Sequence, residues 1–154
     1  MKLSLQEKYG IQALVTLGLR RGRGKMQTRE IAREEGIPRK FLEQVLLTLK
    51  EAGIVESTRG KDGGYTLSRR PQEISLRQII EAFKGPLALF PCLKGENAPL
   101  CAECQGKKDC WIQKTLGGVS ELMVAALEQV SLADMCQQAE KVRRSTTEGR
   151  MYYI

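Results

Sequence analysis

Four of the chain's five cysteines lie close together, spaced as Cys92-x8-Cys101-x2-Cys104-x5-Cys110. Thiolates are soft ligands that bind iron–sulfur clusters and zinc alike, and four of them would complete a tetrahedral structural zinc site. The sequence contains no histidine, which excludes His-based catalytic triads, His general bases and His metal ligands. The cysteines therefore predict metal or redox chemistry, and by themselves they slightly favour zinc. Cys136 stands apart, in an expected helix, and is predicted to be a small buried apolar residue.

The positive charge of the chain is unevenly placed. Residues 1–74 hold 15 Lys and Arg against nine Asp and Glu, whereas residues 75–154 hold 10 against nine. A basic N-terminal half suits a polyanionic partner such as DNA, because phosphate contacts release condensed counterions. No apolar run reaches membrane-spanning length and the polar start lacks a signal-peptide pattern, so we expect a soluble cytoplasmic protein. A cysteine-based redox enzyme is not expected, because no βαβ pattern surrounds the CxxC pair.

The first predicted helix covers residues 4–20. Its inward face is expected to consist of Ile11, Leu14, Val15, Gly18 and Leu19. Six residues with four positive charges and two glycines follow, and we refer to this segment, Arg20-Arg21-Gly22-Arg23-Gly24-Lys25, as the basic turn.

Two further helices have the pattern of a helix-turn-helix. Thr28 is predicted to cap a short helix over 29–35, and Gly36 suits the left-handed residue that follows such a helix. The next helix is predicted over 38–52, with a buried stripe of Leu42, Val45, Leu46 and Leu49. Its exposed face is expected to carry Arg39, Lys40, Glu43, Gln44 and Lys50. A short helix, a tight turn and a second helix with exposed polar side chains is the arrangement that reads DNA in helix-turn-helix proteins.

A β-hairpin is predicted directly after these helices. Residues 54–57 and 65–67 read as its strands, and Asp62-Gly63 is a strong turn signal between them. The glycines do not form a nucleotide-binding loop, because neither GK[ST] opening a helix nor GxGxxG between a strand and a helix is present. The predicted fold is therefore mainly α with a small β wing, a winged helix-turn-helix.

The second half of the chain is predicted to contain a loop and a long helix. Ser75 caps a helix through Phe83, and residues 84–109 lack helical periodicity. A helix over 111–130 carries apolar residues at spacings of three and four, namely Leu116, Val119, Met123, Ala126, Leu127 and Val130. Such a seam either docks on the helical domain of the same chain or pairs with a second copy. Because this helix is longer than a small winged domain can cover, we expect a homodimer, which also matches paired half-sites in DNA. Ser131 is predicted to cap a last helix over 132–142.

Four parts are therefore expected along the chain. They are a winged helix-turn-helix domain over 1–83, a cysteine-rich cluster-binding loop over 84–110, the dimerisation helix with the short last helix over 111–142, and a flexible tail over 143–154.

Several motifs resemble one particular family. They are Phe41-Leu42-Glu43-Gln44-Val45-Leu46, Leu49-Lys50-Glu51-Ala52-Gly53-Ile54-Val55, Ser57-Thr58-Arg59-Gly60 and Gly63-Gly64-Tyr65, together with the opening Met1-Lys2-Leu3 and Tyr9. These residues closely resemble the Rrf2 family, whose best-known members are iron–sulfur regulators of the IscR and NsrR type. The resemblance covers residues 1 to about 140. It implies a transcription factor rather than an enzyme, one that binds promoter DNA as a homodimer.

The resemblance also implies roles for residues of the winged domain. The recognition helix would enter the major groove. There Glu43 would accept a hydrogen bond from the N4 amino group of cytosine and would act mainly by discriminating between base sequences. Arg59 would enter the minor groove, whose narrow parts concentrate negative potential. Arg39 and Lys40 are expected to contact phosphates. The full set of expected DNA-binding residues is Thr28, Arg39, Lys40, Glu43, Gln44, Arg59, Gly60 and Lys61.

For the cysteines, the resemblance implies an iron–sulfur cluster, 2Fe–2S or 4Fe–4S, held by Cys92, Cys104 and Cys110. The chain departs from the family pattern, because Cys101 is an additional cysteine that would serve as a further or alternative ligand. Gln113 stands where some members have a ligating His, and Lys8 where others have an acidic ligand from the partner. The implied function is regulation by iron, redox state or nitric oxide. The alternative is a zinc-bound or metal-free regulator, for example of cysteine metabolism, that acts through a thiol switch or a partner protein.

Overall fold

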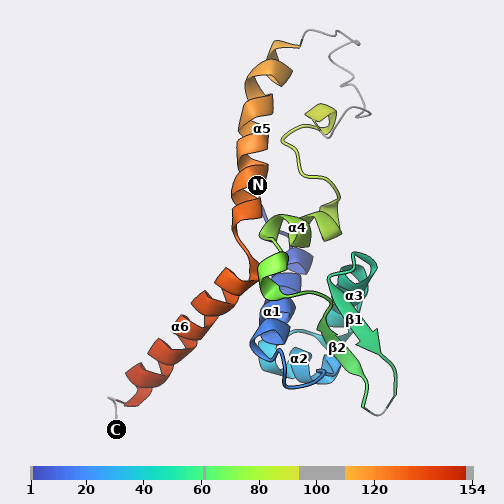
Figure 1. Ribbon diagram of the computed structural model, residues 1–154, viewed down its shortest axis with the longest axis vertical. Helices are drawn as coiled ribbons and strands as arrows, with labels where there is room; N and C mark the ends of the chain where they lie inside the picture. The colour runs from blue at the N-terminus through green and yellow to red at the C-terminus, as the bar shows by residue number, and fades with distance from the viewer. Residues whose placement is uncertain (1, 61, 94–109, 152–154) are drawn as a thin grey trace.

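The computed structural model describes residues 2–60, 62–93 and 110–151 and is mainly helical (Figure 1). The helices are α1 (Leu5–Leu19), α2 (Thr28–Glu35), α3 (Arg39–Glu51), α4 (Leu76–Lys84), α5 (Trp111–Gln129) and α6 (Leu132–Met151), with 3-10 turns η1 (Pro71–Glu73) and η2 (Pro91–Leu93). The strands β1 (Val55–Thr58) and β2 (Gly64–Leu67) form one antiparallel hairpin. The predicted fold class is confirmed. No described helix is both long and apolar enough to cross a membrane.

Helix α1 lies at the centre of the N-terminal domain. It packs against α2, α3, α4, α6 and β2. The predicted inward residues Ile11, Leu14, Val15 and Leu19 all lie in or against the core, but the prediction missed Ala13 and Leu17, which are buried as well. A helix surrounded by neighbours buries more than one face, and the small residues Gly10 and Ala13 admit those neighbours. Phe83 of α4, for example, lies where a side chain at Gly10 would be, with ring atoms 2.7 Å from the Cβ position.

An ion pair between a buried carboxylate and an exposed lysine joins the start of α1 to the end of α4. The side chain of Glu7 is fully buried, its Oε2 accepts from the Ser4 backbone N–H at 2.6 Å, and the Lys84 ammonium lies 2.9 Å away. Burial raises the pKa of the Glu7 carboxyl, but the hydrogen bonds from Ser4 and the charge of Lys84 outweigh it. The net pKa lies below its ordinary value, so Glu7 is ionised and fixes α1 against α4.

The wing is anchored to the rest of the domain through Met26. The strands pair from Val55 with Leu67 to Thr58 with Gly64. The backbone N–H of Met26 donates to the carbonyl oxygen of Tyr65 at 3.1 Å, and that of Tyr65 donates to the carbonyl oxygen of Met26 at 2.8 Å. Met26 therefore adds one residue of a third strand beside β2, which fixes the hairpin against the segment between α1 and α2.

This close pairing predicts that Gly64→Ala will destabilise the wing. A Cβ at Gly64 would lie 2.6 Å from the backbone oxygen of Met26, so the two segments would have to separate. We expect a loss of about 1–3 kcal/mol in the free energy of unfolding, the usual cost of overpacking. Denaturant unfolding measures this loss. Glu56→Ala, an exposed change on the same hairpin, is the control and should shift stability by less than about 0.5 kcal/mol.

Helices α5 and α6 extend from the domain in different directions (Figure 1). They are fixed at their junction, where the Leu76 N–H donates to the carbonyl of Val130 at 2.7 Å and the Leu132 N–H donates to that of Ile74 at 2.8 Å. Ser131 caps α6, as predicted, by accepting from the Asp134 backbone N–H. The helix continues to Met151, although a flexible tail was expected beyond residue 142. Arg143 contributes to this extension, because it pairs with Glu35 of α2 at 3.1 Å.

Candidate nucleic-acid interface

Helix α2 begins one residue earlier than the sequence pattern predicted. Gln27, not Thr28, is the N-cap residue, and its backbone N–H donates to the Glu30 carboxylate at 2.7 Å. Thr28 therefore lies half-exposed in the first turn of α2. The turn after α2 is as expected, with Gly36 in the left-handed conformation at φ +65°.

Helix α3 separates its apolar and polar residues as predicted. Leu42, Val45, Leu46 and Leu49 are buried, whereas Arg39, Lys40, Glu43, Gln44 and Lys50 are exposed. Phe41, at the side of the helix, meets the ring of Tyr9 edge to face, with centroids 5.4 Å apart. This contact and the buried stripe fix how α3 is rotated, and the polar side chains are thereby presented on one exposed surface.

The acidic residue of this surface is paired with a neighbouring arginine. Arg39 Nε lies 2.9 Å from Glu43 Oε1, and both side chains are largely exposed. An exposed pair at this spacing stabilises the helix by only about 0.3–0.5 kcal/mol. Its main consequence is electrostatic, because the guanidinium offsets the negative charge that Glu43 would otherwise present to a polyanion.

A hollow separates the start of α2 from the wing. Its lining residues are Gln27, Thr28, Arg29, Arg39, Thr58, Gly60, Gly63, Gly64 and Tyr65. Two arginines and the first turn of α2 therefore face the same space, and the amino end of a helix carries a partial positive charge. This arrangement is suited to an anion such as a phosphate. Arg29 was not among the predicted DNA-binding residues, because only the tertiary structure brings it opposite the wing.

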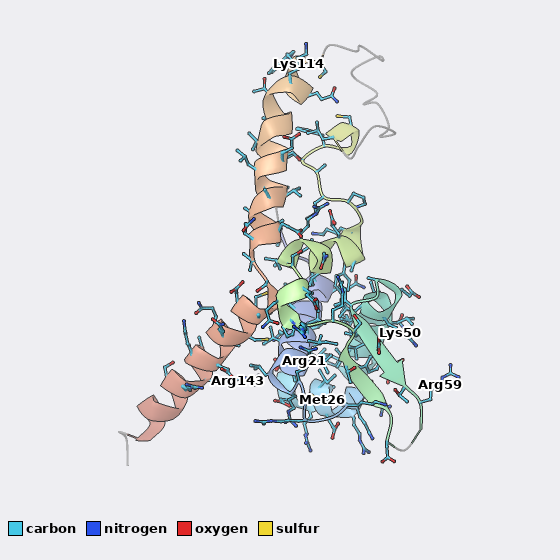
Figure 2. The ribbon with its side chains drawn as sticks, in the orientation of Figure 1. Arg21, Met26, Lys50, Arg59, Lys114 and Arg143 are labelled. Atoms are coloured by element: carbon cyan, nitrogen blue, oxygen red, sulfur yellow. The ribbon has the colours of Figure 1, made fainter. Side chains whose placement is uncertain are left out.

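The wing presents Arg59 at the end of β1. In Figure 2 its side chain points away from the body of the protein. Gly60 follows with φ +110°, and the Gly63 N–H donates to the carbonyl of Gly60 at 3.0 Å to close the turn. Lys61, which was also predicted to bind DNA, lies outside the described residues.

The described cysteines of the loop lie close to α5. Cys92 belongs to η2, Cys110 immediately precedes α5, and both are half-buried. Leu93 of η2 contacts the position of Gly117 on α5. Cys101 and Cys104 lie outside the described residues. Within the described part of the chain, no three His, Cys, Asp or Glu residues are grouped so as to hold a metal.

Cys136 is buried, as the sequence predicted. Its Sγ lies 2.6 Å from the position that a Cβ of Gly18 would take, so α6 and α1 are in close contact there. Burial, and secondarily the charge of Glu140, raise the pKa of this thiol. Cys136 is therefore a packing residue rather than a thiolate ligand.

Comparison with known proteins places these features in a family context. Residues 3–138 match the family model described as Rrf2, an iron-dependent transcriptional regulator. An rrf2-like HTH-type transcriptional regulator from Rhodobacter capsulatus is 34% identical over 131 residues, which are 83% of this chain and 87% of the relative. The regulator CymR of Bacillus subtilis is 27% identical over the whole of both chains. The regulator IscR of Aliivibrio salmonicida is 29% identical, covering 88% of this chain and 77% of the relative.

Two solved structures share the fold. The structure of CymR, described as the global cysteine regulator of B. subtilis, matches with a TM-score of 0.71 at 24% identity, covering 90% of this chain and 98% of CymR. The structure of T. potens IscR matches with a TM-score of 0.70 at 30% identity, covering 92% of this chain and 90% of that one. The winged helix-turn-helix architecture is thus common to all three chains.

Proposed function

The chain belongs to the Rrf2 family of DNA-binding transcriptional regulators, and on this premise we propose that it is a homodimer whose promoter binding is controlled by an iron–sulfur cluster. Membership identifies a transcriptional regulator, not an enzyme. The observation that carries the proposal is the common exposed surface of α3, the first turn of α2 and the wing, which is rich in arginine and lysine.

Each part of this surface has a role in the proposal. The exposed face of α3 enters the major groove, where Gln44 and Glu43 face the base edges. Arg39 and Lys40 contact phosphates, as do Arg29 and Thr28 at the start of α2. Arg59, with Gly60 beside it, enters the minor groove from the wing. Because Arg39 is paired with Glu43, the carboxylate can approach DNA with its charge partly neutralised.

Arg59→Ala is expected to weaken specific binding by about 1–3 kcal/mol, since it removes a cation from the minor groove. Titration at fixed salt measures this loss on a duplex that the wild-type protein selects from a random-sequence pool. Arg69→Ala, which removes an exposed arginine beyond β2, is the matched control and should bind nearly as the wild type does. Wild-type affinity in Arg59→Ala would contradict the role of the wing.

Glu43→Ala is expected to act in a different way. It should reduce the preference for the selected duplex over random-sequence DNA, while affinity for random-sequence DNA stays equal or rises. A carboxylate repels phosphates and contributes only where a base donates to it. The same titrations on both duplexes measure the ratio, and an unchanged ratio would exclude Glu43 from base recognition.

The exposed face of α5 supports the homodimer. Its large exposed apolar side chains include Ile112, Val119 and Leu122, and Leu122 is 73% exposed. Together with Thr115 and Ala126, these positions recur at spacings of three and four, which is the pattern of a helix-pairing seam. This seam differs from the predicted one. Leu116, Met123 and Leu127 are half-buried on the face that also carries the buried Ser120, whose hydroxyl accepts from the Leu89 N–H of the same chain.

The cysteines fit an iron–sulfur cluster in their chemistry, because thiolates are its usual ligands. Cys92, in η2, and Cys110, directly before α5, enclose the segment that contains Cys101 and Cys104, and η2 packs against α5. Cys110 directly precedes the 19-residue α5, and a helix amino end stabilises a thiolate. When bound, the cluster would supply iron that responds to oxygen, nitric oxide or iron supply. The fourth ligand is open among Cys101, a carboxylate and an exchangeable small molecule, because the chain has no histidine.

The second candidate function is a cluster-free regulator, acting through a zinc ion, a thiol switch or a partner protein. The similarity to CymR favours this candidate. CymR is 27% identical to this chain and IscR is 29% identical, so the two relatives are about equally similar to it. The four clustered cysteines favour the cluster-bound form. Iron and sulfide analysis of anaerobically purified protein distinguishes the two candidates.

A further inference from the structure

The basic turn, residues 20–25, is unusual in charge as well as in position. Within the described part of the chain, Arg20 pairs with Glu34 at 3.1 Å, but Arg21 and Arg23 form no ion pair. The fourth cation, Lys25, contacts a neutral group, the Thr58 hydroxyl of the wing, at 2.8 Å. The side chains of Arg21, Arg23 and Lys25, which are not paired with any carboxylate that the structure describes, are exposed. Their mutual repulsion is unfavourable for folding, and a bound polyanion would relieve it.

The geometry of the turn is well defined. Gly22 and Gly24 have φ values of +84° and +96°, which side-chain-bearing residues rarely adopt. The Arg21 N–H donates to the carbonyl of Gly18 at 3.2 Å, and the Arg23 N–H donates to that of Arg20 at 3.0 Å. The next residue after the turn, Met26, is paired with Tyr65 of β2. The turn is thus attached to both strands of the wing: to β2 through the backbone hydrogen bonds of Met26, and to β1 through the side chain of Lys25.

The turn lies on the same end of the molecule as the wing. Figure 2 shows Arg21 and Met26 toward the end where Arg59 projects, with Lys114 of α5 at the opposite end. Together with β2, the turn lines a hollow formed by Leu17, Arg20, Arg21, Gly22, Gly24, Lys25, Met26, Tyr65, Thr66 and Leu67. A duplex whose minor groove receives the wing brings its sugar–phosphate strands close to the wing on both sides, because that groove is only about 6 Å wide.

We infer that the basic turn is a second DNA-binding surface, which contacts the phosphates beside the wing through Arg21, Arg23 and Lys25. The inference rests on the proposed function, since it requires the wing to bind DNA. These contacts would add affinity without adding sequence preference, because phosphates are the same at every base pair. They would also extend the protected stretch of DNA outward from the wing.

Salt-dependent binding of Arg21→Gln/Arg23→Gln tests the inference. The probe is a random-sequence duplex of about 40 base pairs, long enough to extend beyond one winged domain on either side. The plot of log affinity against log salt has a negative slope. Its magnitude should fall by roughly one unit for each phosphate that the variant no longer neutralises. Binding should be weakened most at low salt, and the preference for the selected duplex over this probe should not change.

Two further variants control this experiment. Lys2→Gln/Arg69→Gln removes the same charge from exposed positions outside the turn, and it should leave the slope nearly unchanged. Arg21→Lys/Arg23→Lys keeps the charges and should restore most of the affinity, because a phosphate accepts from either cation. Thermal unfolding verifies that each variant is folded, as expected for substitutions of exposed side chains.

The outcomes separate this inference from the proposed function. If the wild type binds DNA and Arg21→Gln/Arg23→Gln has the same slope, the basic turn does not contact DNA, and the wing and α3 remain the interface. If the charge-matched control reduces the slope equally, only net charge matters and the inference is also wrong. If the wild type binds neither duplex, the proposed function itself fails.

Discussion

Val119→Glu/Leu122→Glu should convert the protein from a dimer to a monomer and reduce its affinity for the selected duplex by roughly 10²–10⁴-fold. Both side chains are largely exposed on α5, so the charges enter the proposed seam without disturbing the packing inside one subunit. Each charge would face its partner's apolar surface and would lose hydration without gaining a counter-ion. The loss of affinity follows because two linked binding domains gain about this factor over one.

Analytical ultracentrifugation and DNA titration measure the two effects. Gln137→Glu/Gln138→Glu, which introduces the same charge at exposed positions of α6, should remain a dimer. Leu116→Glu/Met123→Glu offers a second comparison: it places charges on the half-buried face of α5 and should mainly lower thermal stability. A dimer that persists in Val119→Glu/Leu122→Glu would show that another surface joins the subunits.

Cys92→Ser, Cys104→Ser and Cys110→Ser should each abolish cluster binding, whereas anaerobically purified wild-type protein should be coloured and contain iron and acid-labile sulfide. Replacing a thiolate by a hydroxyl removes a soft ligand, and three thiolates are the smallest ligand set that the resemblance implies. Cys101→Ser distinguishes two forms of the site. Retained iron indicates an open or non-cysteine fourth position, and absence of iron indicates ligation by all four cysteines.

Cys136→Ser is the control, because its sulfur is buried between α1 and α6 and should not affect iron content. Chelator treatment of the wild type should then change its affinity for the selected duplex if the cluster controls DNA binding. Stoichiometric zinc without sulfide, or protein without metal, would overturn the cluster proposal in favour of the cluster-free candidate. DNA binding could persist in either case.

The elements that depend on local chemistry could be predicted from the sequence. The buried stripe of α3 and the presence of the hairpin were predicted correctly, because 3.6-residue periodicity and glycine-rich turn signals act over a few residues. Family membership was evident for the same reason, since its motifs lie within these local elements. The clustering of four cysteines can be read directly from the sequence. That they bind an iron–sulfur cluster is an expectation based on this spacing and on the family resemblance.

Which surfaces are covered depends on tertiary packing, which local patterns do not encode. Periodicity shows that apolar residues of a helix share a face, but not what packs against that face. On α5 the half-buried side holds Leu116 and Met123, and the exposed side holds Val119 and Leu122, a division set by contacts with α4 and η2. Likewise the position of the basic turn beside the wing depends on the pairing of Met26 with Tyr65, 39 residues later in the chain, a contact that no local pattern encodes.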